Sequence, residues 1–219
     1  MSAPWPWLAA ADAPPLAVSE LRLYWCDSTG PDGSRRERID RLLRAALAPL
    51  LGSDAQDLLF GRESKGRPFL RHEQAPDFNL SDTDGGTLLA ICQAGRIGVD
   101  LERIDRQPPV QRLAQRWFAA GEAQALQRLD PEAARRSFLN LWTAKEASCK
   151  ATGTGIYGYL SKWHFDAHSP VPLLQALPGN AGDAAHWRFQ RLAPSPDHTA
   201  VIAMYGVPDP IIRGYRLAF

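Results

Sequence analysis

The stretch Ile97-Gly98-Val99-Asp100-Leu101-Glu102 has the apolar character of a short buried strand, yet it carries two carboxylates. Side chains two residues apart on a strand point to the same side of the sheet, so Asp100 and Glu102 share one face. Val99 and Leu101 take the opposite face, where they can enter a core. The pattern therefore predicts a strand with one apolar face and one acidic face.

The segment Trp142-Thr143-Ala144-Lys145-Glu146-Ala147-Ser148-Cys149-Lys150 reads as a helix that carries a third carboxylate between two lysines. Residues four apart stack on one side of a helix, so Trp142, Glu146 and Lys150 form one stripe. Carboxylates from two rigid elements, with lysines beside them, would suit a hard cation such as Mg²⁺ that holds a phosphate.

The same residues allow plainer interpretations. Asp100 and Glu102 could lie on a solvent-facing strand while Glu146 pairs with Lys150 four residues on. Gly153-Thr154-Gly155 could bring backbone close to a phosphate, but it could equally end the helix and form a turn. Spacing alone does not choose between these alternatives.

The composition indicates a globular protein. The chain has 219 residues, 45% of them hydrophobic, which is enough for one domain or two compact halves. A formal net charge of +1 argues against a protein that binds nucleic acid through bulk electrostatics. Arginines cluster within residues 35–44, but a solvated helix face is the commoner source of such a cluster.

The cysteines and residues 1–15 indicate the cellular compartment of the protein. Cys26, Cys92 and Cys149 are scattered and odd in number, as expected for reduced thiols rather than a disulfide framework or a zinc site. Residues 1–15 lack the basic segment and the long apolar run of a signal peptide, and no stretch is long enough to span a bilayer. We therefore expect a cytoplasmic protein that binds neither membranes nor nucleic acid.

Periodicity predicts an α+β fold without the regular alternation of a βαβ protein. Helices are expected over residues 34–51, 110–117, 120–129 and 132–152. Strands are expected over residues 18–26, 78–80, 87–93, 97–102, 160–165, 186–192 and 198–205, with turn residues at 81–86. The best candidate linker is Gln107-Pro108-Pro109, so we expect one half over residues 1–106 and another over residues 107–219.

Five short motifs occur in a fixed order. They are Gly66-Arg67-Pro68; Phe78-Asn79-Leu80-Ser81; Gly98-Val99-Asp100-Leu101-Glu102; Arg116-Trp117-Phe118 followed by Glu122; and Trp142, Lys145, Glu146 and Lys150 at their helical spacing. Each motif alone is weak, but the ordered set resembles one family, the 4′-phosphopantetheinyl transferases, and within it the Sfp-type enzymes. The resemblance covers most of the chain.

The resemblance implies two similar halves related by a pseudo-twofold axis, each a small antiparallel sheet packed with helices. Coenzyme A would bind in the cleft between them, and the protein would be a monomer. The implied reaction moves the phosphopantetheine arm of coenzyme A to a serine hydroxyl of an acyl, aryl or peptidyl carrier protein. Adenosine 3′,5′-bisphosphate is released, and the reaction uses Mg²⁺, for which Mn²⁺ can substitute.

The resemblance also implies roles by position. The metal ligands would be Asp100, Glu102 and Glu146, and Glu146 would also take the serine proton, directly or through a water. Lys150 would stabilise charge on the transferring phosphate. The residues at the coenzyme A site would be Arg44, Arg67, Ser81, Asp82, Thr83, Lys145 and Lys150, with Arg67 at the nucleotide end and Arg44 at the 3′-phosphate.

Two positions depart from the family pattern. Asp82-Thr83 stands where His-Ser is common, and that histidine helps hold the 3′-phosphate. Because an aspartate adds negative charge, either Arg44 or another cation compensates, or Asp82 points away and Thr83 donates instead. Thr154 stands where a lysine is frequent, which removes another possible phosphate contact.

Two rival functions stay open, and only the first of them rests on these departures. One is a non-catalytic module that binds coenzyme A or a carrier protein. The other is an adaptor for an acidic partner, which rests only on the arginines Arg103, Arg106, Arg112 and Arg116. The arginines also fit the transferase, because carrier proteins are generally acidic and charge attraction raises encounter rates.

Overall fold

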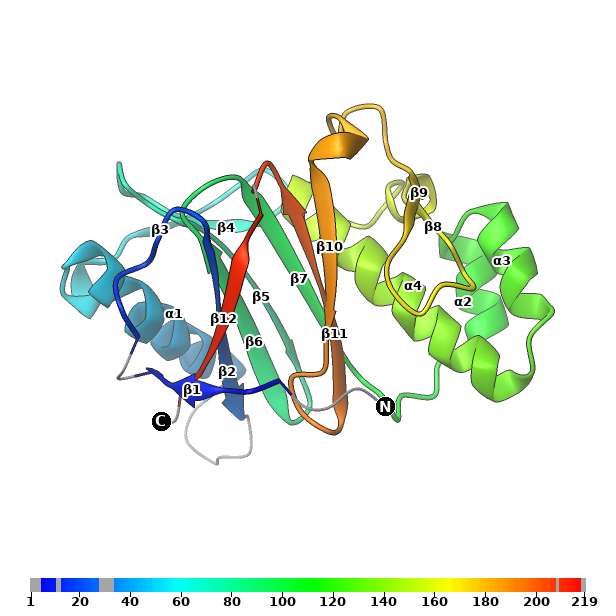
Figure 1. The fold of residues 1–219 in the computed structure, drawn as a ribbon, viewed down its shortest axis with the longest axis horizontal. Helices are drawn as coiled ribbons and strands as arrows, with labels where there is room; N and C mark the ends of the chain where they lie inside the picture. The colour runs from blue at the N-terminus through cyan, green and yellow to red at the C-terminus, as the bar shows by residue number, and fades with distance from the viewer. Residues whose placement is uncertain (1–4, 11–12, 28–33, 208, 218–219) are drawn as a thin grey trace.

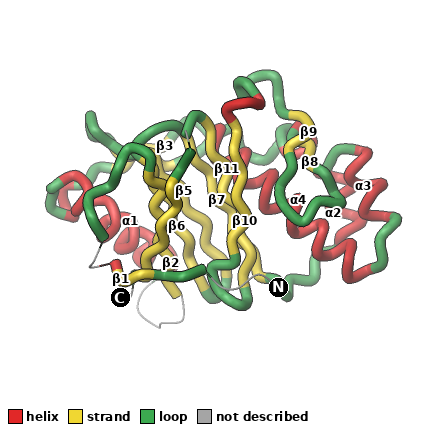
Figure 2. Tube along the Cα trace, viewed as in Figure 1, coloured by secondary structure: helices red, strands yellow, loops and turns green. Residues whose placement is uncertain are grey.

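A computed structural model describes residues 5–10, 13–27, 34–207 and 209–217. Two β-sheets occupy the centre of the molecule (Figures 1 and 2). Helix α1 (Arg35–Leu51) lies on one side, and α2 (Val110–Trp117), α3 (Ala120–Gln127) and α4 (Pro131–Thr152) lie on the other (Figure 1). The predicted α+β class is confirmed. Within those ranges, no helix is both long and apolar enough to cross a membrane.

The first sheet has five strands in the order β1-β12-β2-β6-β5. Their bounds are β1 Leu8–Ala9, β2 Glu20–Asp27, β5 Asp77–Thr83, β6 Gly86–Cys92 and β12 Ile211–Arg216. Strands β2, β6 and β5 are antiparallel neighbours, whereas β12 pairs with β2, and β1 with β12, in parallel. Helix α1 covers one face of this sheet, where Leu42 and Leu47 pack with Tyr24 and Leu89.

The second sheet has three antiparallel strands in the order β10-β11-β7. Their bounds are β7 Arg96–Arg103, β10 Trp187–Leu192 and β11 His198–Tyr205. The odd-numbered residues of β7 (Ile97, Val99 and Leu101) are buried in a core shared with the first sheet. On the other face, Val201 and Ala203 of β11 pack with the long helix α4. The protein is therefore layered, with one apolar core between each pair of adjacent layers.

Short elements complete the chain. The hairpin β3-β4 (Phe60–Arg62 and Pro68–Leu70) follows the 3₁₀ turn η2 (Ala55–Asp57). A second small hairpin, β8-β9 (His164–Phe165 and Leu174–Ala176), follows the 3₁₀ turn η3 (Leu160–Lys162), and η4 (Ala184–His186) precedes β10. These pieces connect the layers without adding another sheet of comparable size.

The boundary expected at residues 106 and 107 does not separate the two sheets. Strand β7, expected to close the first half, pairs instead with β11 from the second half. Strand β12 was not predicted, and it returns from the end of the chain to pair with β2. Periodicity shows which face of a strand is buried, but it carries no signal for the partner of a strand edge.

Two other expectations change in detail. Residues 81–83 belong to strand β5 rather than to the turn. The turn that joins β5 to β6 is only Asp84-Gly85, where Gly85 has a φ of 91°. The first half of the strand expected at 160–165 is instead the 3₁₀ turn η3, and strand β8 consists of only His164 and Phe165. The other predicted helices and strands are present, with ends shifted by a few residues.

The two long helices have the ends that their sequences favour. Ser34 caps α1, since its hydroxyl accepts from the Glu37 N–H while the Glu37 carboxylate accepts from the Ser34 N–H. Asp130 caps α4 in front of a proline in the first turn. Gly153 ends α4 with a φ of 68°, which confirms the helix-end interpretation of the glycine.

The N-terminal tryptophans pack against the first sheet. Trp7 stacks on Trp25 of β2 with ring centroids 6.2 Å apart, and a Cβ on Gly214 of β12 would lie 2.3 Å from Trp5 Nε1. The Trp7 indole also donates to the Pro194 carbonyl at 2.7 Å. The arm therefore joins the first sheet to the turn between β10 and β11.

Candidate active site

Helix α4 crosses strand β7 at Gly98. A Cβ at that position would lie 2.0 Å from the Ala147 carbonyl oxygen and 2.4 Å from the Ala151 nitrogen, so no side chain fits there. Gly98, Asp100 and Glu102 alternate along one face of β7, and this face lies against α4. The glycine thus lets the helix approach closely enough to place its own residues beside Asp100.

Asp100 connects strand β7 with helix α4 and strand β5 through its side chain. Its side chain is buried, and its Oδ1 accepts from Lys150 Nζ at 2.7 Å and from the Ser81 hydroxyl at 3.1 Å. Lys150 Nζ also donates to Ser81 Oγ at 2.9 Å. The solvent-facing interpretation of Asp100 is therefore wrong, and Lys150 has Asp100 as its ion-pair partner.

Strand β5 holds the edge of β7 with side chains instead of a main-chain ladder. Asp77 Oδ2 accepts from the Ile97 N–H at 2.8 Å, and Asn79 Oδ1 accepts from the Val99 N–H at 2.9 Å. Ser81, next in the same alternation, reaches Asp100. Alternate polar residues of β5 therefore satisfy the edge of β7 and fix the position of Asp100.

The two glutamates of the trio lie close to Asp100 in a poorly solvated environment. Burial, followed by the Asp100 carboxylate, raises the pKa of Glu102 to about 7. The same two causes raise the pKa of Glu146 to about 7. Arg106 forms an ion pair with Glu102, and its guanidinium lies over the Trp142 ring. The site therefore holds more negative charge than its neighbouring cations neutralise.

The donors fit a hard divalent cation. Asp100 Oδ2 is buried and has no hydrogen-bond partner, which is costly for a carboxylate oxygen unless a ligand completes the site. Glu102 and Glu146 supply further oxygens, the ligand type that Mg²⁺ prefers. Over the part of the chain that the structure describes, no three acidic, histidine or cysteine side chains already converge as a metal cluster. The fit thus rests on donor chemistry and on the partnerless oxygen.

These pKa values predict an inverted pH dependence of stability for the metal-free protein. Carboxylates whose folded pKa is raised stabilise the fold at low pH, and this stabilisation is lost as the pH rises through about 7. The free energy of unfolding in EDTA should therefore fall by roughly 2–3 kcal/mol between pH 6 and pH 8, about 1.4 kcal/mol for each carboxyl. Mg²⁺ should raise the Tm more at pH 8 than at pH 6, because it competes with protons.

The pH dependence of stability is measured by thermal melts at pH 6 and pH 8, each in EDTA and in Mg²⁺. The double variant Glu102→Gln, Glu146→Gln serves as the control, because it retains the histidines and other groups that titrate in this range. Its Tm should depend less on pH and should respond little to Mg²⁺. If the Tm of the wild-type protein in EDTA falls no more between pH 6 and pH 8 than the Tm of the double variant, the prediction is wrong.

Lys145 lies outside this cluster. It is fully buried, with Nζ 2.7 Å from Glu122 Oε2 and 3.0 Å from the Leu160 carbonyl oxygen, and it also bonds the Trp163 carbonyl. One step along a helix turns the side chain by about 100°, so Lys145 faces α3 while Glu146 faces β7. The structure therefore does not place Lys145 where coenzyme A could reach it.

The two arginines expected at coenzyme A are also engaged elsewhere. Arg67 is buried and bonds the Lys150 carbonyl, the Ile97 carbonyl and the Asp77 carboxylate. Arg44 bonds Asp40 at 2.8 Å and the carbonyls of Ala55 and Leu58, so it ties α1 to the following turn. Neither guanidinium lies beside Asp82.

The ion-pair partner of Asp82 is Arg35 rather than Arg44. Arg35, at the start of α1, forms an ion pair with its carboxylate, and the Thr87 hydroxyl donates to the other oxygen. Arg35 and Asp82, together with Thr83 and Arg38, line a pocket of about 410 Å³ at the end of the β5-β6 hairpin. Arg35 thus compensates the charge of Asp82.

A larger groove of about 1040 Å³ lies between α1 and the β3-β4 hairpin. Its lining includes Ile39, Asp40, Phe60, Gly61, Arg62 and Pro68. The groove offers an apolar ring surface and arginines next to the hairpin that contains Arg67.

Thr154, the other departure from the family pattern, lies beyond the end of α4. Its hydroxyl is 3.0 Å from that of Thr152.

Sequence reasoning missed the residues that support the trio. Asp77, Asn79, Arg35 and Arg106 each contact a site residue or its strand, but they were not singled out for that role. The alternation of polar and apolar residues in Asp77-Phe78-Asn79-Leu80-Ser81 was a usable signal, because it marks one polar face of a buried strand.

Comparison with known proteins gives one consistent result. A model of the 4′-phosphopantetheinyl transferase superfamily matches residues 96–204. The Synechocystis sp. protein slr0495, named as a candidate 4′-phosphopantetheinyl transferase, is 39% identical over 149 residues, which cover 67% of this chain and 59% of that protein. The 4′-phosphopantetheinyl transferase HetI of Nostoc sp. is 31% identical over 180 residues, which cover 80% of this chain and 73% of HetI.

A 4′-phosphopantetheinyl transferase of Bacillus subtilis is 30% identical over 117 residues, which cover 53% of this chain and 51% of that protein. The chain thus spans between about half and three quarters of the length of these relatives. The family match over residues 96–204 contains β7, α4 and the acidic trio between them. On the extent of the match to HetI, this chain belongs to the 4′-phosphopantetheinyl transferase superfamily.

Proposed function

We propose that the protein transfers the 4′-phosphopantetheine arm of coenzyme A to a serine of a carrier protein, as a holo-[acyl-carrier-protein] synthase of this superfamily. The observation that carries the proposal is Asp100, whose buried carboxylate has one oxygen on Lys150 and one without a partner. Glu102 and Glu146 lie close enough for Asp100 to raise their pKa values. A cationic phosphate-binding group and hard oxygen ligands therefore meet at one point.

In this proposal Asp100, Glu102 and Glu146 hold Mg²⁺ or Mn²⁺, which would neutralise charge on the pyrophosphate of coenzyme A. The serine oxygen attacks the phosphorus that carries the pantetheine arm, and the bond from that phosphorus to the bridging oxygen of the pyrophosphate breaks. The bridging oxygen leaves with adenosine 3′,5′-bisphosphate.

Two residues act on charge and protons during this step. Lys150 stabilises the negative charge on the transferring phosphate. Glu146 takes the serine proton, directly or through a water.

We further propose that coenzyme A lies between two halves related by a pseudo-twofold axis. Each half would consist of an antiparallel three-stranded unit and a long helix: β2-β6-β5 with α1, and β10-β11-β7 with α4. The nucleotide would occupy the groove beside the β3-β4 hairpin, and the 3′-phosphate the pocket of Asp82 and Thr83, with Arg35 in place of Arg44. We expect a monomer in the cytoplasm, in keeping with three free cysteines.

The competing function is a module that binds coenzyme A or a carrier protein without chemistry. Its support is Asp82, which adds a carboxylate where a phosphate would lie and occupies Arg35. Such a module would bind coenzyme A without forming product.

Release of adenosine 3′,5′-bisphosphate separates the two functions. The protein is incubated with coenzyme A, Mg²⁺ and a panel of apo carrier proteins, and the nucleotide is quantified by chromatography. A transferase releases one nucleotide per carrier, and none when the carrier is omitted. Binding of coenzyme A by calorimetry, without release on any carrier, would support the module and contradict the proposal.

A further inference from the structure

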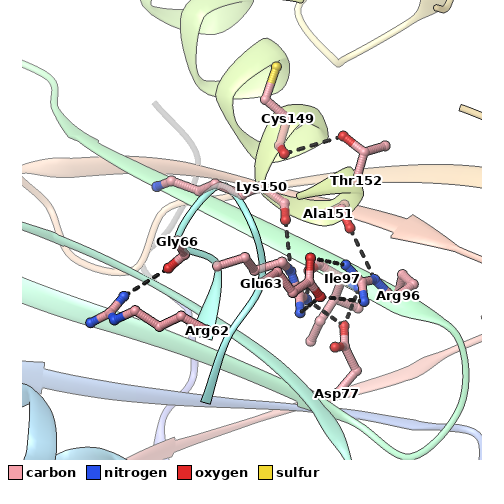
Figure 3. Close-up of polar contacts among 11 residues, drawn as sticks. Arg62, Glu63, Gly66, Asp77, Arg96, Ile97, Cys149, Lys150, Ala151 and Thr152 are labelled. Carbon is pink, nitrogen blue, oxygen red and sulfur yellow. Dashed lines mark hydrogen bonds and ion pairs between the residues drawn. The ribbon is translucent and has the colours of Figure 1, made fainter. Parts of the chain in front are cut away.

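Two arginines meet the C-terminal end of helix α4. Arg67 Nε donates to the Lys150 carbonyl oxygen at 2.9 Å, and Arg96 Nε donates to the Ala151 carbonyl oxygen at 3.2 Å (Figure 3). The last carbonyls of a helix lack partners within it, and the helix dipole places partial negative charge there. Two guanidinium groups from outside the helix therefore satisfy and neutralise this end.

The arginines are themselves fixed. Arg67 Nη2 donates to Asp77 Oδ2 at 2.7 Å and to the Ile97 carbonyl oxygen at 2.9 Å. Glu63 pairs with Arg96 through both oxygens, at 2.8 Å and 3.2 Å (Figure 3). We call Arg67, Arg96, Asp77 and Glu63 the α4 clamp. Its members come from the β3-β4 turn and from the first residues of β5 and β7.

Lys150 is held both at its main chain, by the α4 clamp, and at its side chain. The main-chain oxygen of Lys150 is held by Arg67, while its Nζ is held by Asp100 and Ser81. Asp77, which anchors Arg67, also accepts from the Ile97 N–H of the strand that carries Asp100. Arg67 therefore connects the backbone of Lys150 with the backbone of the strand on which its carboxylate partner lies.

We propose that Arg67 is a positioning residue that sets Lys150 against Asp100, and that its side chain does not contact coenzyme A. The inference rests on the proposed transferase function. Pro68 lines the groove beside α1, whereas Arg67, the preceding residue, is only 6% exposed and has its side chain in the clamp. Nε and Nη2 of Arg67 are bonded to two carbonyls and a carboxylate. Nη1 makes no hydrogen bond, but it is buried and lies 3.7 Å from Glu63 Oε1.

Steady-state kinetics of the variants Arg67→Gln and Arg67→Lys test this assignment, with kcat and the KM for coenzyme A measured separately. Displacement of a reacting group by about 1 Å costs up to about 100-fold in rate. We expect Arg67→Gln to lower kcat about 10- to 100-fold while the KM for coenzyme A changes less than about twofold. Arg67→Lys should recover part of kcat, because one donor and the charge remain.

Arg22→Gln is the matched control. Arg22 is also a buried arginine that bonds a carboxylate and a carbonyl, those of Glu20 and Pro14, but it lies in the first sheet, outside the clamp. Its variant should lose stability comparably and keep its kcat per folded molecule. If Arg67→Gln does not fold, Arg67→Lys alone decides, with the same split of kcat from KM.

The outcomes are distinct. A wild-type protein that releases no nucleotide from coenzyme A refutes the proposed function and, with it, this inference. An active wild type whose Arg67 variants raise the KM for coenzyme A and retain kcat shows that Arg67 contacts the substrate, which overturns the positioning role. A fall in kcat equal to that of Arg22→Gln would make Arg67 a purely structural residue, which also overturns it.

Discussion

Replacement of Asp100 with asparagine should lower the rate of phosphopantetheine transfer by about a thousandfold or more. The variant keeps the shape of the side chain and an acceptor for the Ser81 hydroxyl, but it removes the charge that pairs with Lys150. It also removes the negative charge from the oxygen that has no partner. The Tm should change little, because the substitution relieves repulsion with Glu102 and Glu146 while it weakens one ion pair.

Asp105→Asn is the matched control, since Asp105 is an exposed aspartate near the same strand and pairs with Arg103. Turnover of this variant should stay within about twofold of wild type, in line with the small energies of surface ion pairs. Initial rates of nucleotide release and a thermal melt measure both variants. Turnover by Asp100→Asn within tenfold of wild type, with an unchanged Tm, would remove Asp100 from the reaction.

Replacement of Lys145 should affect stability rather than the chemical step. Lys145→Ala leaves the Glu122 carboxylate buried without its cation, and it leaves two carbonyls without their donor. Loss of one partner of a buried pair costs about 3–5 kcal/mol. Burial lowers the pKa of the Lys145 ammonium and Glu122 opposes this shift, which is consistent with a cation that depends on its partner. Urea unfolding measures the loss.

Two comparisons separate the structural role of Lys145 from a role in binding coenzyme A. The double variant Lys145→Met, Glu122→Gln removes both charges and should recover at least half of the lost stability. Lys150→Met should instead collapse turnover. Its loss of stability should be smaller than that of Lys145→Ala, because the Lys150 side chain is 27% exposed. A stable Lys145→Ala protein with a raised KM for coenzyme A would return Lys145 to the substrate site.

Much of the candidate site could be predicted from local periodicity. The alternation in Ile97–Glu102 placed Val99 in a core and Asp100 on the face that meets α4, and the structure agrees. The helical stripe placed Glu146 and Lys150 on one side of α4, and Lys150 does meet Asp100. These predictions succeed because both depend on the direction of side chains from a regular backbone.

The side-chain and strand placements that local patterns do not predict depend on which surfaces meet. Lys145 belongs to the same motif as Lys150, yet it faces α3, and no spacing rule shows that Glu122 is buried there to receive it. Arg67 is expected at the nucleotide from the resemblance. Its guanidinium bonds the Lys150 carbonyl at the end of α4, whereas the next residue, Pro68, lines the groove beside α1. The pairing of β12 with β2 joins residues about 190 positions apart, a contact that local patterns do not encode.

The most direct test of the transferase is the intact mass of an apo carrier protein after incubation with this protein, coenzyme A and Mg²⁺. We predict a mass gain of one phosphopantetheine on the carrier serine, abolished by EDTA and restored by excess Mg²⁺. The Asp100→Asn protein should leave the carrier unmodified under the same conditions. An unmodified carrier in every case across acyl and peptidyl carriers, or a gain that EDTA does not affect, would contradict a metal-dependent transfer site between β7 and α4.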